Sequence, residues 1–144
     1  MRVLIDTNVL VDVLLARKPY VATSAEILTL GERGAFSGYV CASAITTLYY
    51  LIQKEKGDGL SRKEIQRLLV MYEVAPVTRA VLEGALLLEL DDYEDAVLSE
   101  AARLAGVDTI LTRNTEDFKK SLVRAMTPRE MLSALKSGGA ESKT

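Results

Sequence analysis

Two short apolar runs in this chain each end directly in carboxylate and amide side chains. Asp6-Thr7-Asn8 follows Val3–Ile5, and Thr112-Arg113-Asn114 follows Thr109–Leu111. A run of this kind predicts a buried strand, and ligands of open parallel α/β sheets bind beyond the carboxyl ends of the strands. Asp6 is therefore either the first ligand of an active site or a cap of the next helix, a role that Thr7 or Asn8 can also fill.

A third acidic group, residues 91–95, precedes a stretch with helical spacing. Asp95, Leu98 and Ala102 are three and four residues apart and share one helix face, so Asp95 extends an apolar stripe. A carboxylate on such a face is costly unless it binds a metal or is paired, although the helix dipole lowers that cost in the first turn. The alternative is structural: one acid of the group caps the helix and another completes a capping box.

The sequence contains no histidine. This absence removes Ser-His triads, histidine-based ribonuclease chemistry and nearly all zinc sites. Catalysis must then rest on carboxylates, Lys, Tyr, Ser or Thr, or on a hard metal ion held by oxygen. With 20 acidic residues in the chain, Mg²⁺ or Mn²⁺ is the natural candidate.

Strands that alternate with helices predict the fold. Strands are expected at Val3–Ile5, Tyr39–Cys41, Val74–Val77 and Thr109–Leu111. Helices are expected at Val9–Leu15, Thr23–Leu30, Ala44–Lys56, Ser61–Met71, Thr78–Leu88 and Asp92–Ala105, and from Thr127 onward. This order is typical of an α/β fold with three layers, α/β/α, around a central, mainly parallel sheet of four to five strands.

Two of these helices carry sequence signals for their starts. Ser61-x-x-Glu64 has the spacing of a capping box, and Thr127-Pro128-Arg129-Glu130 places a cap, a first-turn proline and an acid in order. No internal repeat or linker interrupts the pattern. We therefore predict a single domain over residues 1–135, followed by a flexible tail over residues 136–144.

The bulk composition narrows the setting of the protein. The net charge of −2 indicates no particular partner, and basic clusters such as Lys119-Lys120 are either solvated faces or the rim of an acidic site. The apolar runs are too short to cross a membrane, and no secretion signal is recognisable. A single cysteine, Cys41, fits a reducing compartment. We expect a cytoplasmic protein.

If the predicted sheet is parallel, its edge gathers the candidate residues. Asp6 and Asn114 then lie at the same carboxyl edge, and Asp95 faces them from the start of a helix. Three oxygen ligands at one edge suit a metal-dependent phosphodiesterase, in which an ion polarises the phosphate and lowers the pKa of its water.

Four segments together resemble the PIN domain, a small nuclease fold that includes VapC-type toxins of toxin–antitoxin pairs. They are residues 3–10, residues 43–46, residues 92–96 and residues 111–118. Their order and separations match the family over residues 2 to about 120. The resemblance implies an endoribonuclease that uses Mg²⁺ or Mn²⁺ on an RNA substrate. It also implies a homodimer that, if it is a toxin, a small antitoxin neutralises.

The resemblance also implies roles for particular residues. Asp6 matches the first metal-binding aspartate, and Asp95 matches the acid at the start of the later helix. Asn114 stands where the family often has another aspartate, and Asp117 is the nearby acid. We therefore expect Asp6, Asp95 and Asn114 to be catalytic and Asp6, Asp95 and Asp117 to bind metal. The supporting residues are Thr7, Asn8, Thr46, Tyr49, Asp92, Glu94 and Thr112.

The chain departs from the family pattern at two positions. Tyr49 stands where the family usually has a glutamate, about six residues past Ser43, and Asn114 is an amide in a carboxylate position. A subgroup of PIN-like proteins shares the Tyr49-Tyr50 pair. These departures leave a catalytically weak or inactive PIN-like module, which binds RNA or protein, as the alternative.

A second rival is a HAD phosphatase, which has an Asp-x-Asp motif after its first strand. Asn8 occupies the second position of that motif here, and no lysine follows the fourth strand in the required pattern. We therefore predict a metal-dependent ribonuclease.

Overall fold

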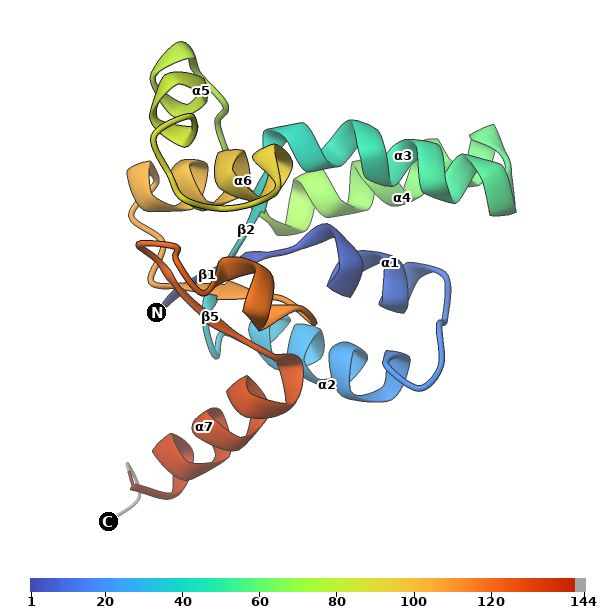
Figure 1. The fold of residues 1–144 in the computed structure, drawn as a ribbon. Helices are drawn as coiled ribbons and strands as arrows, with labels where there is room; N and C mark the ends of the chain where they lie inside the picture. Colours follow the sequence, from blue (N-terminus) through green and yellow to red (C-terminus); the bar gives the residue numbers. More distant parts are fainter. Residues whose placement is uncertain (142–144) are drawn as a thin grey trace.

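The computed structural model describes residues 1–141 and consists of a five-stranded parallel sheet covered by helices (Figure 1). The strands are β1 (Arg2–Ile5), β2 (Ser37–Cys41), β3 (Glu73–Ala75), β4 (Thr109–Leu111) and β5 (Arg124–Met126). The helices are α1 (Thr7–Leu14), α2 (Val21–Glu32), α3 (Ala42–Lys56), α4 (Asp58–Met71), α5 (Arg79–Ala85), α6 (Tyr93–Leu104) and α7 (Pro128–Glu141), with a 3-10 turn, η1 (Thr115–Phe118). The spatial order of the strands is β3-β2-β1-β4-β5.

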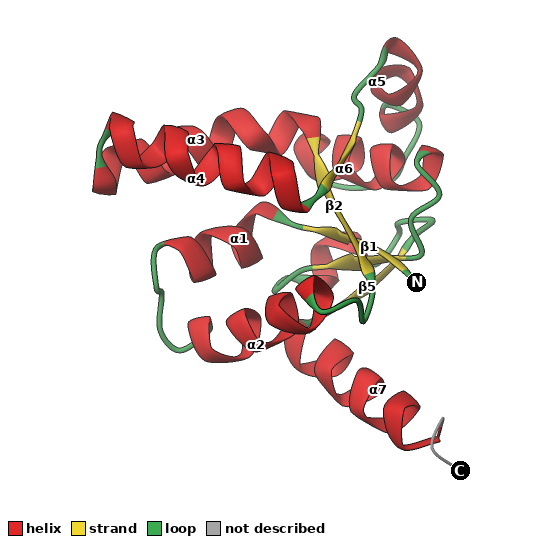
Figure 2. Cartoon of the chain, turned by 180° about the vertical axis from the view of Figure 1, so that it is seen from behind, coloured by secondary structure: helices red, strands yellow, loops and turns green. Residues whose placement is uncertain are grey.

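Alternating side chains of the central strands feed two hydrophobic cores, one on each face of the sheet. Val3 and Ile5 of β1 point into a core shared with α1, α2, α3, α4 and α7. Leu4, between them, points into the other core, which contains much of α5 and α6. Figure 2 shows helices on both sides of the strands. The predicted three-layer α/β/α fold with a parallel sheet is confirmed.

Every strand pair is parallel, so the carboxyl ends of β1 and β4 lie side by side. Ile5 is paired in register with Leu111, and the backbone N–H of Asp6 donates to the Leu111 carbonyl at 2.9 Å. β1 and β4 are both central, and their apolar residues are almost fully buried. This register places the residues that follow the two strands next to each other.

The predicted start of α7 is confirmed by a complete capping box. The Glu130 N–H donates to Thr127 Oγ1 at 3.1 Å, and the Thr127 N–H donates to Glu130 Oε1 at 3.2 Å. The predicted stop of α6 is also confirmed. Gly106 has a φ of 74°, a left-handed conformation that glycine adopts without a steric penalty, and the helix ends just before it.

The predicted capping box at Ser61 is wrong. α4 begins three residues earlier, at Asp58, so Ser61 lies inside the helix. Its buried hydroxyl donates to the carbonyl oxygen of Tyr49 at 2.7 Å and so ties α4 to α3. The S-x-x-E pattern fails as a signal here because Gly57, with a φ of 88°, already turns the chain into α4.

β5 was not expected at a particular place, and α7 extends past residue 135, the expected end of the domain. β5 is a three-residue edge strand beginning with an exposed arginine, so it offers no apolar run to detect. The tail expected from residue 136 is helical as far as Glu141, because α7 continues past Leu135 and Lys136 pairs with Glu26 of α2 (Nζ–Oε1 3.6 Å). Residues 142–144 lie outside the described part of the chain. None of the described helices is long and apolar enough to cross a membrane.

Candidate functional site

Asp6 lies at the carboxyl end of β1 and is a cap of the next helix, one of the two roles expected for it. Its backbone occupies the N-cap position of α1, and its Oδ1 accepts from the Thr7 N–H at 2.7 Å. Its Oδ2 accepts from the Thr112 hydroxyl, which follows β4, at 2.8 Å. Asp6 therefore caps a helix while its carboxylate is held at the edge of the sheet.

Asn8 does not cap the helix but joins the same network. Its Nδ2 donates to Thr112 Oγ1 at 3.4 Å, and its Oδ1 accepts from the Arg113 N–H at 3.3 Å. The Asn114 N–H also donates to Thr112 Oγ1, at 3.1 Å. The buried Thr112 hydroxyl thus links the start of α1 to the turn that presents the exposed Asn114.

Asp95 faces Asp6 from the first turn of α6. The Asp92 side chain caps this helix by accepting from the Asp95 N–H at 3.0 Å. Among the described residues, the reciprocal bond from the Asp92 N–H to the Asp95 carboxylate is not made, so that carboxylate is not used in a capping box. It lines a cavity together with Asp6, Thr7 and Glu94.

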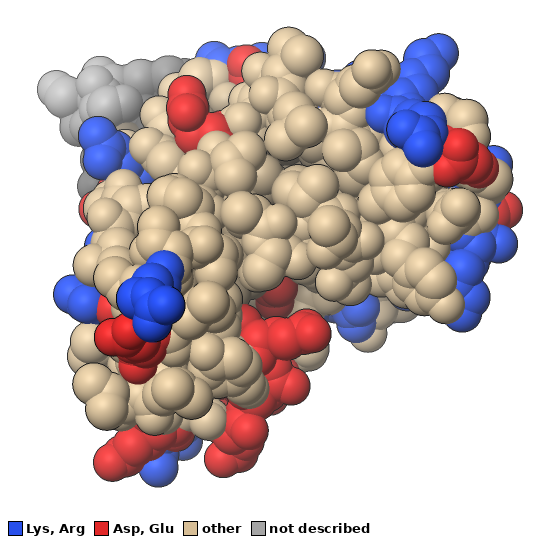
Figure 3. All heavy atoms as spheres, turned by 90° about the horizontal axis from the view of Figure 1, so that it is seen from above, with Lys and Arg blue, Asp and Glu red and all other residues tan. Residues whose placement is uncertain are grey.

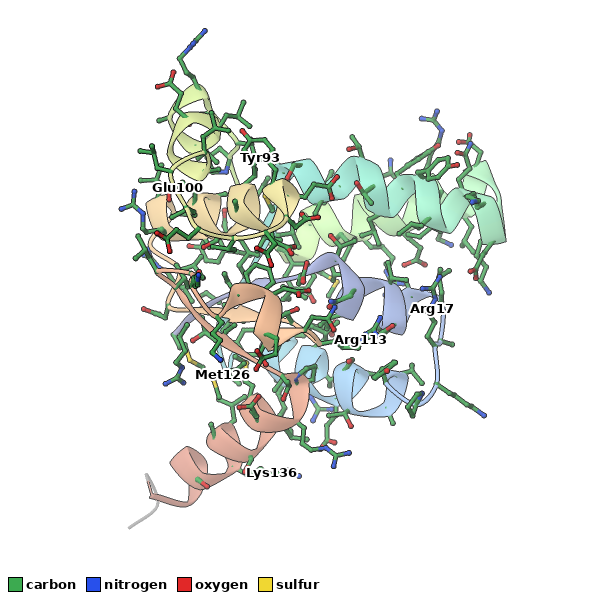
Figure 4. The ribbon with its side chains drawn as sticks, viewed as in Figure 1. Arg17, Tyr93, Glu100, Arg113, Met126 and Lys136 are labelled. Atoms are coloured by element: carbon green, nitrogen blue, oxygen red, sulfur yellow. The ribbon has the colours of Figure 1, made fainter. Side chains whose placement is uncertain are left out.

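Tyr93 anchors the start of α6 beneath α5. Its hydroxyl donates to the carbonyl oxygen of Leu82 at 2.9 Å, and Figure 4 shows its side chain where the two helices meet. The adjacent Glu94 and Asp95 are thereby held over the cavity. α5 and α6 also pack through Val81, Ala85 and Val97 of the shared core.

The two central carboxyl groups of this edge, Asp6 and Asp95, both have raised pKa values. The pKa of Asp95 is raised to about 7, first by burial and then by the carboxylates of Asp92, Asp6 and Asp117. Burial also raises the pKa of Asp6, while the hydrogen bonds from Thr112 and Thr7 act in the opposite direction. Such carboxylates are poised to bind a cation, since a cation removes the repulsion.

Asp117 lies on η1, at the outer side of the same acidic group. It lines a second hollow with Asp92, Asp95 and Glu116, and Lys119 and Lys120 line that hollow as well. Figure 3 shows red acidic atoms gathered at the notch between two lobes of the molecule. Asp95 borders both hollows, so the carboxylates form one continuous acidic site with lysines beside it.

The donor chemistry of this site fits a hard divalent cation. All of its candidate ligands are oxygens, and burial, followed by repulsion from neighbouring carboxylates, raises the pKa values of Asp6 and Asp95. In the part of the chain that the structure describes, no three acidic or cysteine side chains come close enough to form a ready-made cage.

The sequence matches a known protein family over most of its length. Residues 2–116 match the model of the PIN domain, described as PIN_3, which covers more than half of the chain. The chain belongs to the PIN domain family. The resemblance of the four sequence segments and the predicted fold are thereby both confirmed.

Individual relatives agree with this assignment over most of their length. Ribonuclease VapC1 of Aquifex aeolicus is 28% identical over 135 residues, which cover 90% of this chain and 92% of the relative. VapBC2 of Rickettsia felis, solved with a DNA fragment from its promoter, has a TM-score of 0.70 at 15% identity and covers 88% and 98% of the two chains. VapC20 of Mycobacterium tuberculosis, described as a sarcin–ricin loop cleaving toxin, has a TM-score of 0.62 at 16% identity over 75% and 86%.

Two residues expected to support this PIN domain site point elsewhere. The Tyr49 hydroxyl donates to Asp58 of α4, and Tyr49 does not line the cavity that holds Asp6 and Asp95. The Thr46 hydroxyl donates back to the Ser43 carbonyl at 3.4 Å. Both residues lie on α3, and neither lines the cavity of Asp6 and Asp95.

Two α3 residues line the cavity although no role in the site was predicted for them. Ser43 and Thr47 lie one helical turn apart and contribute to its wall, beside Asp6 and Asp95. Their spacing of four was a usable signal, because position 47 shares a helix face with position 43, whereas position 49 does not. The contacts of the Arg113 side chain with Asp12 and Tyr20 were not predicted either.

Proposed function

We propose that this PIN domain is a metal-dependent endoribonuclease and the toxin of a toxin–antitoxin pair. The observation that carries the proposal is the meeting of Asp6 and Asp95 at the carboxyl edge of the sheet, where burial and, after it, repulsion raise the pKa of Asp95 to about 7. The similarity to a protein named ribonuclease VapC1 supports RNA as the substrate. The solved VapBC neighbours, which are complexes, support a small antitoxin as the partner.

Each residue of the site has a distinct part in this proposal. Asp6 and Asp95 would hold Mg²⁺ or Mn²⁺, and Asp117 and Asn114 would flank the ion on its solvent side. A bound divalent ion supplies charge stabilisation for the phosphate and a lower pKa for water. Thr112 and Thr7 orient the two oxygens of Asp6.

Two lysines beside the acidic site would assist the binding of the RNA substrate. Lys119 and Lys120 offset the acidic site for an incoming RNA phosphate, since they line the outer hollow. The chain has no histidine, and its one cysteine, Cys41, is buried. Water is therefore the nucleophile of the proposed hydrolysis.

The proposal is tested with the full-length chain, purified free of any partner, on single-stranded and structured RNA. We expect cleavage with Mn²⁺ or Mg²⁺ that stops in EDTA and in Asp6→Asn and Asp95→Asn. Glu73→Gln, which changes an exposed acid on β3 away from the site, serves as a control and should cleave as the wild type does. Cleavage that is indifferent to EDTA or to both Asp variants would refute the metal-dependent mechanism.

Tyr49 and Asn114 favour a second candidate, a PIN-like module that binds RNA or protein without cleaving. Position 49 offers no carboxylate, and its hydroxyl is engaged by Asp58. This candidate predicts RNA retention in a gel-shift assay with no product in Mn²⁺. Product formation that depends on Asp6 rejects it.

A further inference from the structure

Arg113 lies in the turn that orients Asp6, and its own side chain contacts Asp12 and Tyr20. The residue before it, Thr112, donates its hydroxyl to Asp6, and the residue after it, Asn114, donates its N–H back to that hydroxyl oxygen. The Arg113 N–H is accepted by Asn8. Any displacement of Arg113 therefore moves both ends of this network.

The Arg113 guanidinium is held in place by two groups. Its Nε lies 2.7 Å from Oδ2 of Asp12, a residue of α1 that is completely buried. Its Cζ lies 4.1 Å from the centre of the Tyr20 ring, a cation–π contact. Figure 4 shows Arg113 beside α1. A planar guanidinium can pair with a carboxylate and stack on a ring at once, which a lysine cannot reproduce.

Asp12 depends on Arg113 for its charge compensation. Burial raises the pKa of Asp12, and the positive charges of Arg113 and Arg17 oppose that rise. Within the described residues, neither carboxylate oxygen of Asp12 makes a well-aligned hydrogen bond. An ion pair between buried groups is favourable only while both partners are present.

These contacts close a ring through the candidate site. Asp6 caps α1, and Asp12 follows six residues later on the same helix, about 9 Å along its axis. Arg113 joins Asp12 to the turn, and Thr112 of that turn returns to Asp6. The first turns of α1 and the turn after β4 are thus fixed to each other at two points on either side of Asn8.

We propose that Arg113 is a positioning residue of the candidate site: by binding Asp12 and stacking on Tyr20 it fixes the Thr112–Asn114 turn against α1 and so orients the Asp6 carboxylate. The inference rests on the proposed function for its catalytic consequence. In this proposal Arg113 acts through the turn, since its guanidinium contacts Asp12 and Tyr20. Orientation within fractions of an ångström decides the efficiency of such sites.

The test compares Arg113→Lys and Asp12→Asn with a matched pair elsewhere. Glu100 of α6 is also a buried carboxylate paired with an arginine, Arg103 (Oε1–Nε 3.1 Å), and faces Gly84 of α5 instead of the turn. Glu100→Gln and Arg103→Lys therefore report what the loss of such a pair does to stability alone. Melting temperature, Mn²⁺ affinity, kcat and KM are measured for all variants.

We expect Arg113→Lys and Asp12→Asn to lower kcat at least about tenfold while KM for RNA stays within about twofold of the wild type. Both substitutions should also weaken the binding of Mn²⁺ several-fold. The Glu100 and Arg103 variants should lower the melting temperature without changing kcat or Mn²⁺ affinity. Unchanged kcat and Mn²⁺ affinity in the Arg113 variant would make its role merely structural. A raised KM with unchanged kcat would make Arg113 an RNA contact and overturn the proposal.

A third measurement separates this inference from the proposed function. Amide hydrogen exchange follows the N–H groups of Thr7 and Asn114, which are bonded to Asp6 and Thr112. In Arg113→Lys we expect both to exchange at least about tenfold faster than in the wild type, and in Arg103→Lys we expect no change. If the wild type cleaves no RNA, the proposed function fails, while unchanged exchange in Arg113→Lys rejects the positioning role by itself.

Discussion

The Thr112 hydroxyl donates to Asp6 Oδ2 at 2.8 Å and thereby joins residues that are 106 positions apart in the sequence. Both residues follow central parallel strands whose last residues are in register. Thr112 is fully buried, and its hydroxyl oxygen also accepts from Asn8 and Asn114. One hydroxyl group thus determines where one oxygen of Asp6, the first of the proposed metal ligands, points.

Thr112→Val tests this relationship, because valine keeps the shape of threonine but has no hydroxyl. The Asp6 oxygen loses its donor, so we expect a stability loss of about 1–3 kcal/mol in urea or thermal unfolding. The loss of a group that hydrogen-bonds to a metal ligand typically weakens metal binding by about 10- to 100-fold. We therefore expect the Mn²⁺ affinity to fall by about that factor in calorimetry. Thr112→Ser retains the hydroxyl and should stay close to the wild type. Wild-type Mn²⁺ affinity in Thr112→Val would contradict the assigned role of the bond.

Asp95→Asn tests whether the acidic site destabilises the metal-free fold. The pKa of Asp95 rises from 3.8 in the unfolded chain to about 7 in the folded one. Between these values the folded state binds more protons, so the wild type loses stability as the pH rises from about 4 to 7. In EDTA at pH 8 the variant should be more stable than the wild type by about 1–2 kcal/mol, after solvent screening of this half-buried group.

The same comparison at pH 4 supplies the control for Asp95→Asn. Asp95 is protonated in the folded state at that pH, so the advantage of the variant should disappear. Glu73→Gln, at an exposed position on β3, should show no such pH dependence in chemical denaturation. An Asp95→Asn variant that is less stable than the wild type at pH 8 would show that the carboxylate is already compensated.

Metal binding should depend on pH for the same reason. An ion displaces the proton from Asp95, so Mn²⁺ affinity should rise by up to about tenfold per pH unit below pH 7 and level off above it. Calorimetry at pH 6 in two buffers of different ionisation heat should detect the released proton. Asp95→Asn should bind Mn²⁺ weakly, and its binding should release no proton. A wild-type affinity that is flat between pH 5.5 and 8 would place the ion away from Asp95.

Much of the fold followed from local patterns in the sequence. Asp92 caps α6, Thr127 and Glu130 cap α7, and Gly106 ends α6, because each of these signals acts within one or two turns. The apolar runs at Val3 and Thr109 predicted the strands that carry Asp6 and Thr112. β5 escaped detection because an exposed three-residue edge strand has almost no hydrophobic pattern.

The candidate site was predictable only in part, because side-chain direction depends on packing. The placement of Asp6 and Asn114 followed from a parallel sheet and that of Asp95 from a helix start, whereas Asp117 was expected only from the family resemblance. Position 49 was expected near them, but the hydroxyl of its tyrosine is bound by Asp58 across the α3–α4 pair. The pairing of Asp12 with Arg113 joins distant segments, and the single acid in the apolar run from Val9 to Leu14 was its only trace in the sequence.

Tyr49→Phe tests whether the family's glutamate position has lost its part in this site. The substitution removes only the hydroxyl that donates to Asp58, and the ring can keep its packing against the core of α1 and α3. Because Tyr49 does not line the cavity of Asp6 and Asp95, we expect Mn²⁺ affinity, kcat and KM within about twofold of the wild type. Thr47→Val, which changes a residue of the cavity wall, is the matched α3 variant and should reduce kcat more than Tyr49→Phe does. Loss of Mn²⁺ affinity or of cleavage in Tyr49→Phe alone would show that the hydroxyl turns from Asp58 to the metal during the reaction.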